Sequence, residues 1–180
     1  ETQHLQLPKV RIMSSQPHPD RALISINCAV ITISDTRTQE TDRSGQLIQE
    51  KLQANGHQIQ DYTILKDEPQ AIINHLERLS KQDILEVIIC NGGTGIAPRD
   101  TTYDALVQVL EKTLPGFGEL FRYLSYQEIG ARAIASRAVA GIYSNKLIFS
   151  LPGSTNAVNL GLEKLILPEL NHLVQQLKIK

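Results

Sequence analysis

The sequence has few aromatic residues, no tryptophan and almost no net charge. Aromatic residues make up 4% of its 180 residues, and 18 basic residues stand against 19 acidic ones, for a formal net charge of -1. Nucleic-acid binding depends on surplus basic residues that neutralise phosphates and on aromatic rings that stack on bases. We therefore expect no nucleic-acid partner.

Long hydrophobic runs and cysteine are also scarce. The best apolar run, Cys28 to Ile33, is far shorter than the roughly 18 residues of a membrane helix, and the N-terminus lacks a signal-peptide pattern. The two cysteines, Cys28 and Cys90, lie in strand-like apolar runs, which predicts buried reduced thiols rather than a disulfide or metal pair. We expect a cytoplasmic protein without membrane contact. The five histidines show no ligand spacing, which disfavours structural zinc.

Hydrophobic periodicity divides the chain into a leader and one folded domain. Residues 1–22 are polar and proline-containing, as is typical of a flexible leader, and residues 23–180 form the predicted domain. There, strand and helix patterns alternate, which predicts a layered α/β domain with a mostly parallel sheet. The expected strands are 26–34, 59–65, 86–91, 138–143 and 147–151, and the expected helices are 44–55, from 69, from 101, 117–129 and from 154, the last interrupted at Pro168.

Three polar loops follow predicted strands. Because parallel strands end at one edge of a sheet, where ligands usually bind, these loops should share a rim. They are Ser34-Asp35-Thr36-Arg37, Gly92 to Asp100, and Pro152-Gly153-Ser154-Thr155-Asn156. Taken singly, the first is an ordinary loop and the last is a helix start capped by Ser154.

Three glycines between a buried strand and a helix are the strongest chemical signal. In Gly92-Gly93-Thr94-Gly95, the missing side chains allow backbone N–H groups to approach an anion, and the following helix adds partial positive charge. Pro98 stands where a dinucleotide-binding motif has its third glycine, which disfavours a nicotinamide oxidoreductase, and no P-loop sequence is present. The alternative is a tight strand-to-helix turn without a ligand.

Two acidic residues stand directly before predicted helices. Asp67 precedes Glu68-Pro69, and Asp100 precedes the helix from residue 101, so both positions are typical of a helix N-cap. A cap uses one carboxylate oxygen and leaves the other free. Both acids could therefore also hold Mg2+, which favours one or two carboxylates together with substrate phosphates. The residues alone leave both interpretations open.

Three arginines in the second half of the chain are candidate phosphate clamps. A guanidinium can grip a phosphate with two hydrogen bonds, which makes Arg122, Arg132 and Arg137 suitable. The alternative for each is a solvated surface charge or an ion pair.

Six separated motifs occur in order over about residues 26 to 175. They are Ile33-Ser34-Asp35-Thr36-Arg37, Asp42-Arg43-Ser44-Gly45, Gly92-Gly93-Thr94-Gly95 with Pro98-Arg99-Asp100, Pro115-Gly116-Phe117-Gly118-Glu119, Ser136-Arg137-Ala138, and Pro152-Gly153-Ser154. Together they resemble the MoaB/MogA-type molybdopterin adenylyltransferases of molybdenum cofactor biosynthesis. The stretch from Phe121 to Gly141 is most similar to the MoaB branch.

The resemblance implies a fold, an assembly and a reaction. The fold is an α/β three-layer sandwich with a mostly parallel sheet, and the assembly is a homotrimer, or a hexamer in the MoaB branch. The reaction is Mg2+-dependent adenylyl transfer from ATP to the phosphate of molybdopterin, which gives adenylylated molybdopterin and pyrophosphate. Its two catalytic acids fall here on Asp67 and Asp100, which would hold the Mg2+.

The charges of the two substrates lead to a hypothesis about the residues around these acids, because two anions must be brought together. The N–H groups of Gly92, Gly93, Thr94 and Gly95 would cradle phosphate, and Arg99 would stabilise charge on the transferring group. The loops with Ser34 and Asp35 and with Pro152, Gly153 and Ser154 would hold the pterin or its phosphate. The alternative function is a non-catalytic oligomer of the MoaB branch that binds molybdopterin or the finished cofactor, since a fold alone does not fix function.

Overall fold

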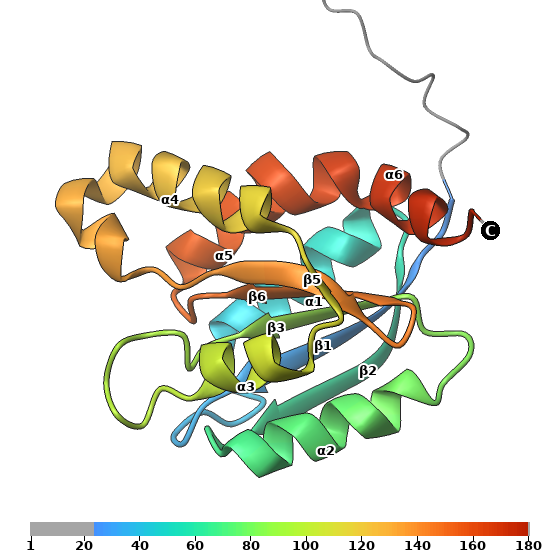
Figure 1. Ribbon diagram of the computed structural model, residues 1–180, viewed down its shortest axis with the longest axis horizontal. Coiled ribbons are helices and arrows are strands. Elements are labelled where there is room, and N and C mark those ends of the chain that lie inside the picture. Colours follow the sequence, from blue (N-terminus) through green and yellow to red (C-terminus); the bar gives the residue numbers. More distant parts are fainter. Residues whose placement is uncertain (1–23, 180) are drawn as a thin grey trace, which may run out of the picture.

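The computed structural model describes residues 24–179, which form one six-stranded sheet between helices (Figure 1). The strand order is β2-β1-β3-β6-β5-β4. The four strands β2, β1, β3 and β6 run parallel, β5 pairs antiparallel with β6, and β4 pairs antiparallel with β5. The strands are β1 (Asn27–Ile33), β2 (Gln58–Leu65), β3 (Val87–Asn91), β4 (Lys112–Thr113), β5 (Val139–Tyr143) and β6 (Lys146–Leu151).

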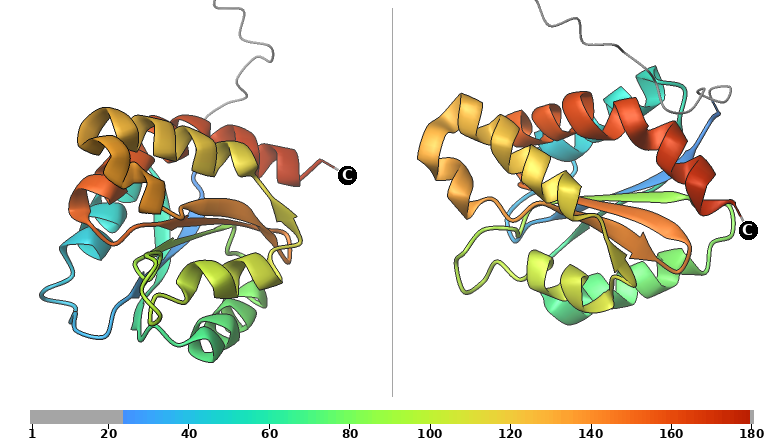
Figure 2. Two further views of the ribbon diagram at one scale, coloured as in Figure 1. Left: turned by 60° about the vertical axis from the view of Figure 1, so that its left-hand side comes forward. Right: turned by 45° about the horizontal axis from the view of Figure 1, so that its top comes forward.

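Helices cover both faces of the sheet, which makes three layers (Figures 1 and 2). On one face lie α1 (Arg43–Ala54), α4 (Pro115–Ile129), α5 (Thr155–Gly161) and α6 (Leu167–Leu177), and on the other lie α2 (Pro69–Ser80) and α3 (Thr102–Val109). The 3-10 helix η1 (Gly130–Ala135) follows α4, and the π-helical turn η2 (Leu162–Ile166) joins α5 to α6. This arrangement confirms the predicted α/β sandwich with a mostly parallel sheet.

Alternate residues of β1 belong to the two hydrophobic cores. Cys28 and Val30 pack in the core beneath α1 and α6, whereas Ala29 and Ile31 pack in the core beneath α2 and α3. A strand that is covered on both faces reads as a nearly continuous apolar run, because each side chain points into one of the two cores. This is why the sequence identified the strand so clearly.

The strand order places a crevice between β1 and β3. From β1, the chain crosses through α1 to β2 on one side, and then through α2 to β3 on the other. Because α1 and α2 cover opposite faces of the sheet, the carboxyl ends of β1 and β3 form a topological switch point, where ligands bind in α/β sheets. The Ser34 loop and the glycine loop leave the sheet at this point.

The β5–β6 hairpin brings further residues to the same edge. Its two-residue turn, Ser144 and Asn145, has positive φ at both positions (47° and 58°), which suits the right-handed twist of the paired strands. Since β5 runs antiparallel to β6, Val139 at the start of β5 pairs with Ser150 near the end of β6. The residues just before β5, Ser136 and Arg137, therefore reach the rim where the parallel strands end.

Several local predictions are confirmed. The Ser154 hydroxyl accepts a hydrogen bond from the N–H of Ala157 (3.2 Å) and caps α5, and the last helix is interrupted by η2 just before Pro168, which has no N–H to donate. Cys28 and Cys90 are free and buried, and burial raises the pKa of each thiol to about 12. Within residues 24–179, every helix is too short or too polar to cross a bilayer. The predicted leader, residues 1–22, lies outside the described residues.

Candidate functional site

A cavity of about 560 Å3 opens at the carboxyl edge of the parallel strands. Its walls come from the three predicted loops together with α4 and η1. The predicted site residues that line it are Ser34, Gly92, Gly93, Thr94, Gly95, Asp100, Pro152, Gly153 and Ser154. Asp35, Asp67 and Arg99 do not line it, and Arg99 lies exposed in the glycine loop. The structure thus joins the three loops at one rim, as the strand pattern predicted.

The glycine loop packs too closely for side chains at two positions. Gly92 and Gly93 have φ of 99° and 62°, a region that residues with a Cβ rarely adopt. A Cβ on Gly92 would collide with the carbonyl oxygen of Ile33, and a Cβ on Gly93 would collide with the Thr102 hydroxyl and the Asp67 carboxylate. The loop therefore brings bare backbone to the cavity wall.

A run of backbone N–H groups in this loop is available to a ligand. The N–H of Gly92 donates to the carbonyl oxygen of Leu151 (3.0 Å), which ties the loop to β6. The next four N–H groups, of Gly93 to Ile96, donate to no acceptor among residues 24–179. Consecutive unpaired N–H groups beside a cavity form a site suited to an anion.

Asp67 connects the loop after β2 to the start of α3. Its Oδ1 accepts hydrogen bonds from the Thr101 N–H (3.0 Å) and the Thr101 hydroxyl (2.8 Å), while its own N–H donates to Oδ1 of Asp35 (3.2 Å). The expectation that Asp67 could cap its own helix is wrong, because Glu68 is the N-cap of α2 and no side chain caps it. Asp67 instead binds Thr101, the N-cap residue of α3, across 34 residues of sequence.

Asp100 lies against the same glycine loop, at Gly95. Its Oδ2 accepts a hydrogen bond from the N–H of Ala97 (3.0 Å), and Thr101 rather than Asp100 is the N-cap of α3. A Cβ on Gly95 would lie 2.5 Å from Oδ2 of Asp100, as a Cβ on Gly93 would meet the Asp67 carboxylate. Both carboxylates therefore pack against glycines of this loop, two residues apart. Each keeps one carboxylate oxygen outside these hydrogen bonds.

Of the three arginines predicted as candidate phosphate clamps, one lines the cavity and two do not. Arg132 is exposed and lines the cavity, whereas Arg122 does not line it. Arg137 lies behind the glycine loop, where its Nε donates to the carbonyl oxygen of Thr94 (3.1 Å). Arg37, which the sequence had not singled out as a clamp, also lines the cavity.

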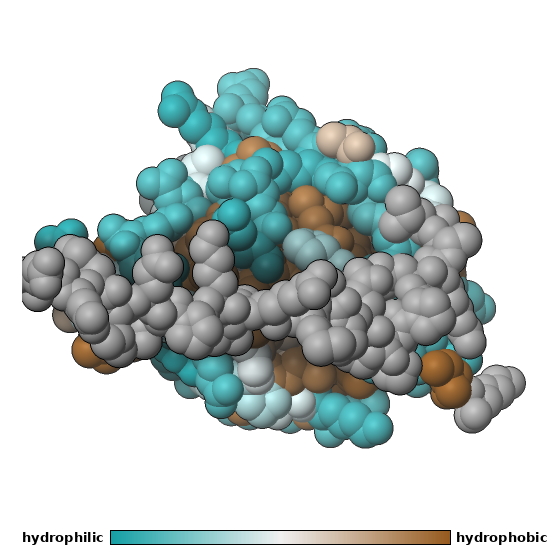
Figure 3. Space-filling view, turned by 90° about the horizontal axis from the view of Figure 1, so that it is seen from above, coloured by the Kyte–Doolittle hydropathy of each residue, from teal (hydrophilic) through white to brown (hydrophobic). Residues whose placement is uncertain are grey.

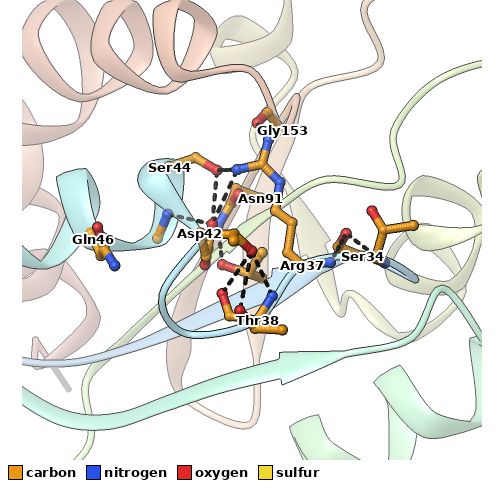
Figure 4. Close-up of polar contacts among 12 residues, drawn as sticks. Ser34, Arg37, Thr38, Asp42, Ser44, Gln46, Asn91 and Gly153 are labelled. Carbon is orange, nitrogen blue, oxygen red and sulfur yellow. Dashed lines mark hydrogen bonds and ion pairs between the residues drawn. The ribbon is translucent and has the colours of Figure 1, made fainter.

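Arg37 is held in the cavity wall by the buried carboxylate of Asp42 (Figure 4). Nη1 of Arg37 lies 3.5 Å from Oδ1 of Asp42 and 3.1 Å from the Ser44 hydroxyl, and Nη2 donates to the carbonyl oxygen of Gly153 (3.4 Å). Asp42 is fully buried and also accepts hydrogen bonds from the Gly45 N–H (3.0 Å) and the Tyr62 hydroxyl (2.7 Å). This cluster ties the loop after β1 to the loop after β6.

The charge of Asp42 is stabilised by its donors. Burial by itself would raise the pKa of this carboxyl, but hydrogen bonds from Thr32, Gly45, Tyr62 and Ser44 bring it below its ordinary value. Burial, with the hydrogen bond to Asp42, raises the pKa of Tyr62. The cluster is therefore an ionised carboxylate with a neutral phenol, and its net charge is cancelled by Arg37. The sequence signal was the Asp42-Arg43-Ser44-Gly45 motif, where Asp42 is the N-cap of α1.

Two buried polar atoms beside the cavity have no hydrogen-bond partner within residues 24–179. They are Oδ1 of Asn91 and the hydroxyl of Ser136, and both residues line the cavity. The Asn91 amide is oriented by its Nδ2, which donates to the Thr32 hydroxyl oxygen (2.9 Å). An unpaired buried polar group costs about 1–3 kcal/mol, so these atoms mark a place where a ligand can supply the missing bonds.

No group of three or more His, Cys, Asp or Glu side chains in residues 24–179 is arranged to hold a metal ion by itself. A metal that binds here would need oxygen ligands from a substrate, which is the mode that Mg2+ adopts with phosphates. The arrangement as a whole offers free N–H groups and two arginines in the cavity wall to an anionic ligand, and the carboxylates of Asp67 and Asp100 lie against the same glycine loop.

Known proteins resemble this chain in both sequence and structure. Residues 29–172 match the family described as a probable molybdopterin binding domain. The chain is 50% identical over 166 residues to molybdenum cofactor biosynthesis protein B of Halalkalibacterium halodurans, which covers 92% of this chain and 98% of that protein.

Two solved structures extend this similarity to the fold. A crystal structure of a molybdenum cofactor biosynthesis protein B has a TM-score of 0.84 and 46% identity, and covers 87% of this chain and 98% of that one. The molybdopterin biosynthesis enzyme MoaB of Thermus thermophilus has a TM-score of 0.76 and 32% identity, and covers 86% of this chain and 98% of that one. With a family match over most of its length and half of its aligned residues identical to those of a relative, the chain belongs to the molybdopterin-binding-domain family, in its MoaB branch.

Proposed function

We propose that this protein catalyses Mg2+-dependent transfer of the adenylyl group of ATP to the phosphate of molybdopterin. The observation that carries the proposal is the glycine loop, with free N–H groups from Gly93 to Ile96 and the carboxylates of Asp67 and Asp100 against it. The names of the MoaB relatives support molybdopterin as the substrate. The cavity of about 560 Å3 is within the usual size range for small-molecule sites.

The proposed reaction joins two anions, so charge and position are the main tasks of the protein. An oxygen of the molybdopterin phosphate bonds to the α-phosphorus of ATP as the bond from that phosphorus to the β-phosphate oxygen breaks, and pyrophosphate leaves. The N–H groups of the glycine loop bind phosphate oxygens, and Arg132, which is exposed in the cavity wall, lowers the repulsion between the two substrates. Such positioning and charge stabilisation supply most of the acceleration in reactions of this kind.

The two acids fit Mg2+ that arrives with ATP. Oδ1 of Asp67 and Oδ2 of Asp100 are fixed by protein hydrogen bonds, which leaves one oxygen of each carboxylate as a possible ligand. One or two carboxylates with substrate phosphates form the usual protein site for this ion. When bound, Mg2+ neutralises phosphate charge and polarises the phosphoryl oxygens. Asp67 and Asp100 would hold it, since their carboxylates lie against the glycine loop.

A second function, binding of molybdopterin or the finished cofactor without turnover, is favoured by one observation. Asp67 does not line the cavity and already binds Thr101 at the start of α3, which is a structural role. The unpaired Asn91 and Ser136 atoms accept a ligand equally well in either function. The two functions differ in whether ATP is cleaved.

Purified protein with molybdopterin, ATP and Mg2+ tests the proposal, with adenylylated molybdopterin and pyrophosphate as the measured products. Asp100→Asn should lower turnover at least about 100-fold, since a metal or transition-state contact is lost. Asp83→Asn is the matched control, because Asp83 is exposed in the segment between α2 and β3, away from the cavity. Asp100→Asn with full turnover would remove Asp100 from the mechanism. Molybdopterin binding without any product would support the binding function.

Self-association and a cytoplasmic location complete the proposal. On α4, four apolar side chains spaced three residues apart are each more than half exposed: Leu120, Tyr123, Tyr126 and Ile129. The face formed by α4 and α6 shows hydrophobic patches among hydrophilic residues (Figure 3). Contiguous exposed apolar residues are typical of protein interfaces, which supports a trimer or hexamer of this chain. A monomeric mass by light scattering would contradict it.

The two free thiols suit a reducing compartment, which supports a cytoplasmic location.

A further inference from the structure

The guanidinium of Arg137 is surrounded by oxygen atoms of the glycine loop and of α3. Its Nε donates to the carbonyl oxygen of Thr94 (3.1 Å), and its Nη2 donates to the carbonyl oxygens of Gly95 and Asp100 (3.0 Å for Asp100). Its Nη1 donates to both carboxylate oxygens of Asp104, each at 3.0 Å. All three nitrogens of the guanidinium therefore donate to oxygen atoms of the protein, so the group is bonded to the loop and to α3 rather than directed at a phosphate.

These bonds fix the direction of the N–H groups on the opposite side of the loop. All peptide bonds in residues 24–179 are trans, and in a planar trans peptide the C=O and the next N–H point in opposite directions. Because the carbonyl groups of Thr94 and Gly95 point to Arg137, the N–H groups of Gly95 and Ile96 point away from it. Both of these N–H groups lack a protein acceptor among residues 24–179.

The peptide between Asp100 and Thr101 is gripped from both sides. Its carbonyl oxygen accepts from Nη2 of Arg137 (3.0 Å), and its N–H donates to Oδ1 of Asp67 (3.0 Å). Arg137 also bonds to Thr94 and Gly95, so one guanidinium joins the two ends of the exposed segment 96–99. Asp100 is thereby held at the base of the loop.

The contacts of Arg137 hold the glycine loop in its conformation rather than attract an anion. Its charge is matched by the Asp104 carboxylate, and its guanidinium carbon lies 4.9 Å from the ring centre of Tyr103. Lysine has a single compact ammonium group and could not reproduce a planar fork that reaches three carbonyl oxygens and a carboxylate. The feature that matters is therefore the shape of the guanidinium.

We propose that Arg137 is a positioning residue that holds the glycine loop in its anion-binding form, with the N–H groups of Gly95 and Ile96 turned to phosphate and Asp100 fixed beside them. The inference rests on the proposed function for the identity of the anion, a phosphate of ATP or molybdopterin. It adds a residue behind the loop that touches no ligand and still sets the affinity for one.

Binding of inorganic pyrophosphate with Mg2+, measured by calorimetry, tests this role without any need for turnover. Arg137→Lys should raise the Kd at least about tenfold, since loss of the loop geometry affects several phosphate contacts at once. Arg78→Lys is the matched control, because Arg78 pairs with Asp61 beside the edge strand β2, and its Kd should equal that of the unmodified protein. Methylguanidinium added to Arg137→Ala should restore part of the lost affinity, which a general loss of stability would not allow.

Asp104→Asn separates the two halves of the Arg137 contact. Asp104 does not line the cavity, so its substitution can change the Kd only through Arg137 and α3. We expect a smaller rise in Kd than for Arg137→Lys, and a double variant no weaker than Arg137→Lys alone, because the two changes act on one interaction. Additive effects of the two substitutions would contradict this coupling.

Each result decides between the proposals. An unchanged pyrophosphate Kd in Arg137→Lys, whether or not its melting temperature falls, would overturn the positioning role. Absence of pyrophosphate binding by the unmodified protein would also overturn it, because the loop would then not bind this anion. If the unmodified protein binds pyrophosphate but forms no adenylylated molybdopterin, the proposed reaction fails and the role of Arg137 stands.

Discussion

The two ends of the parallel strands are built for different purposes. At the amino end, Glu86 accepts the N–H of Asn27 at Oε2 (2.9 Å) and pairs with Lys178 at Oε1 (2.5 Å), and Nδ1 of His57 accepts the N–H of Ile26 (3.3 Å). At the carboxyl end, by contrast, the N–H groups of residues 93–96 and Oδ1 of Asn91 have no partner within residues 24–179.

This difference separates stability from binding. Polar groups that are paired within the protein lower the free energy of the folded state, whereas unpaired buried groups raise it unless a ligand satisfies them. The amino end joins β1, β2 and α6 and stabilises the fold. At the carboxyl end, N–H groups and buried polar atoms stay unpaired and available to a ligand. There, Asp42, Asp67 and Arg137 hold the loops in place in the absence of a ligand.

The largest effect on binding should come from Gly93→Ala. The new Cβ would collide with the Thr102 hydroxyl and the Asp67 carboxylate at a φ of 62°, so the loop must move and the N–H array is lost. We expect the Kd for pyrophosphate with Mg2+ to rise at least about 100-fold by calorimetry.

Gly116→Ala is the control for that substitution. Gly116 lies at the start of α4 with open space around its Cα and no positive φ, so a methyl group should leave the Kd unchanged. A Gly93→Ala variant that binds as tightly as Gly116→Ala would show that the close packing of the loop is irrelevant to the anion.

Substitution of Glu86 should lower the stability of the fold and leave the affinity for pyrophosphate unchanged. Glu86→Ala leaves the N–H of Asn27 without its acceptor, and we expect the free energy of unfolding in urea to fall by about 1–3 kcal/mol. Lys178→Gln removes only the exposed ion pair and should cost less than about 1 kcal/mol. Pyrophosphate affinity should be unchanged in both variants. A large loss of affinity in Glu86→Ala would remove the distinction between the two ends.

A smaller effect at the amino end should depend on pH. The pKa of His57 is below its ordinary value, because the effect of burial outweighs the opposite effect of the nearby Glu86 carboxylate. The pKa of His75 on α2 is also below its ordinary value, because of burial and the positive charge of Arg78. A histidine whose pKa is depressed on folding stabilises the protein above the unfolded pKa of about 6.5, and this contribution is lost as the pH falls toward the folded pKa. The free energy of unfolding should therefore decrease from pH 7.5 to pH values below about 6.

His57→Gln should weaken that pH dependence and leave pyrophosphate binding intact, since His57 lies at the end of the sheet away from the cavity. Identical slopes of stability against pH in the two proteins would show that His57 does not titrate in this range.

The sequence predicted the fold through signals that are local. The strand Ile26–Ser34 and the helix that begins at Pro69 were evident because their apolar spacing and their end residues lie within one short segment. The rim was predictable because parallel strands end at one edge of a sheet. The start of β5 could have been placed there too, since the predicted hairpin over Ser144 and Asn145 implies an antiparallel partner for β6.

Contacts between distant loops could not be predicted in this way. Asp67 has the sequence context of a cap for α2, yet its carboxylate binds Thr101 at the start of α3, 34 residues further along the chain. Arg137 bonds to Thr94 across 43 residues, and nothing near it in the sequence distinguishes a loop anchor from a phosphate clamp. The predicted site residues Asp35 and Arg99 lie outside the cavity wall for the same reason, because side-chain direction depends on the packed loops.

Amide hydrogen exchange with and without pyrophosphate and Mg2+ tests the central claim most directly. If the glycine loop binds phosphate through its backbone, the N–H groups of Gly93, Thr94, Gly95 and Ile96 should exchange more slowly in the complex, while that of Asn27 at the amino end should not change. Bound pyrophosphate that leaves the exchange of these four N–H groups unaltered would contradict the account.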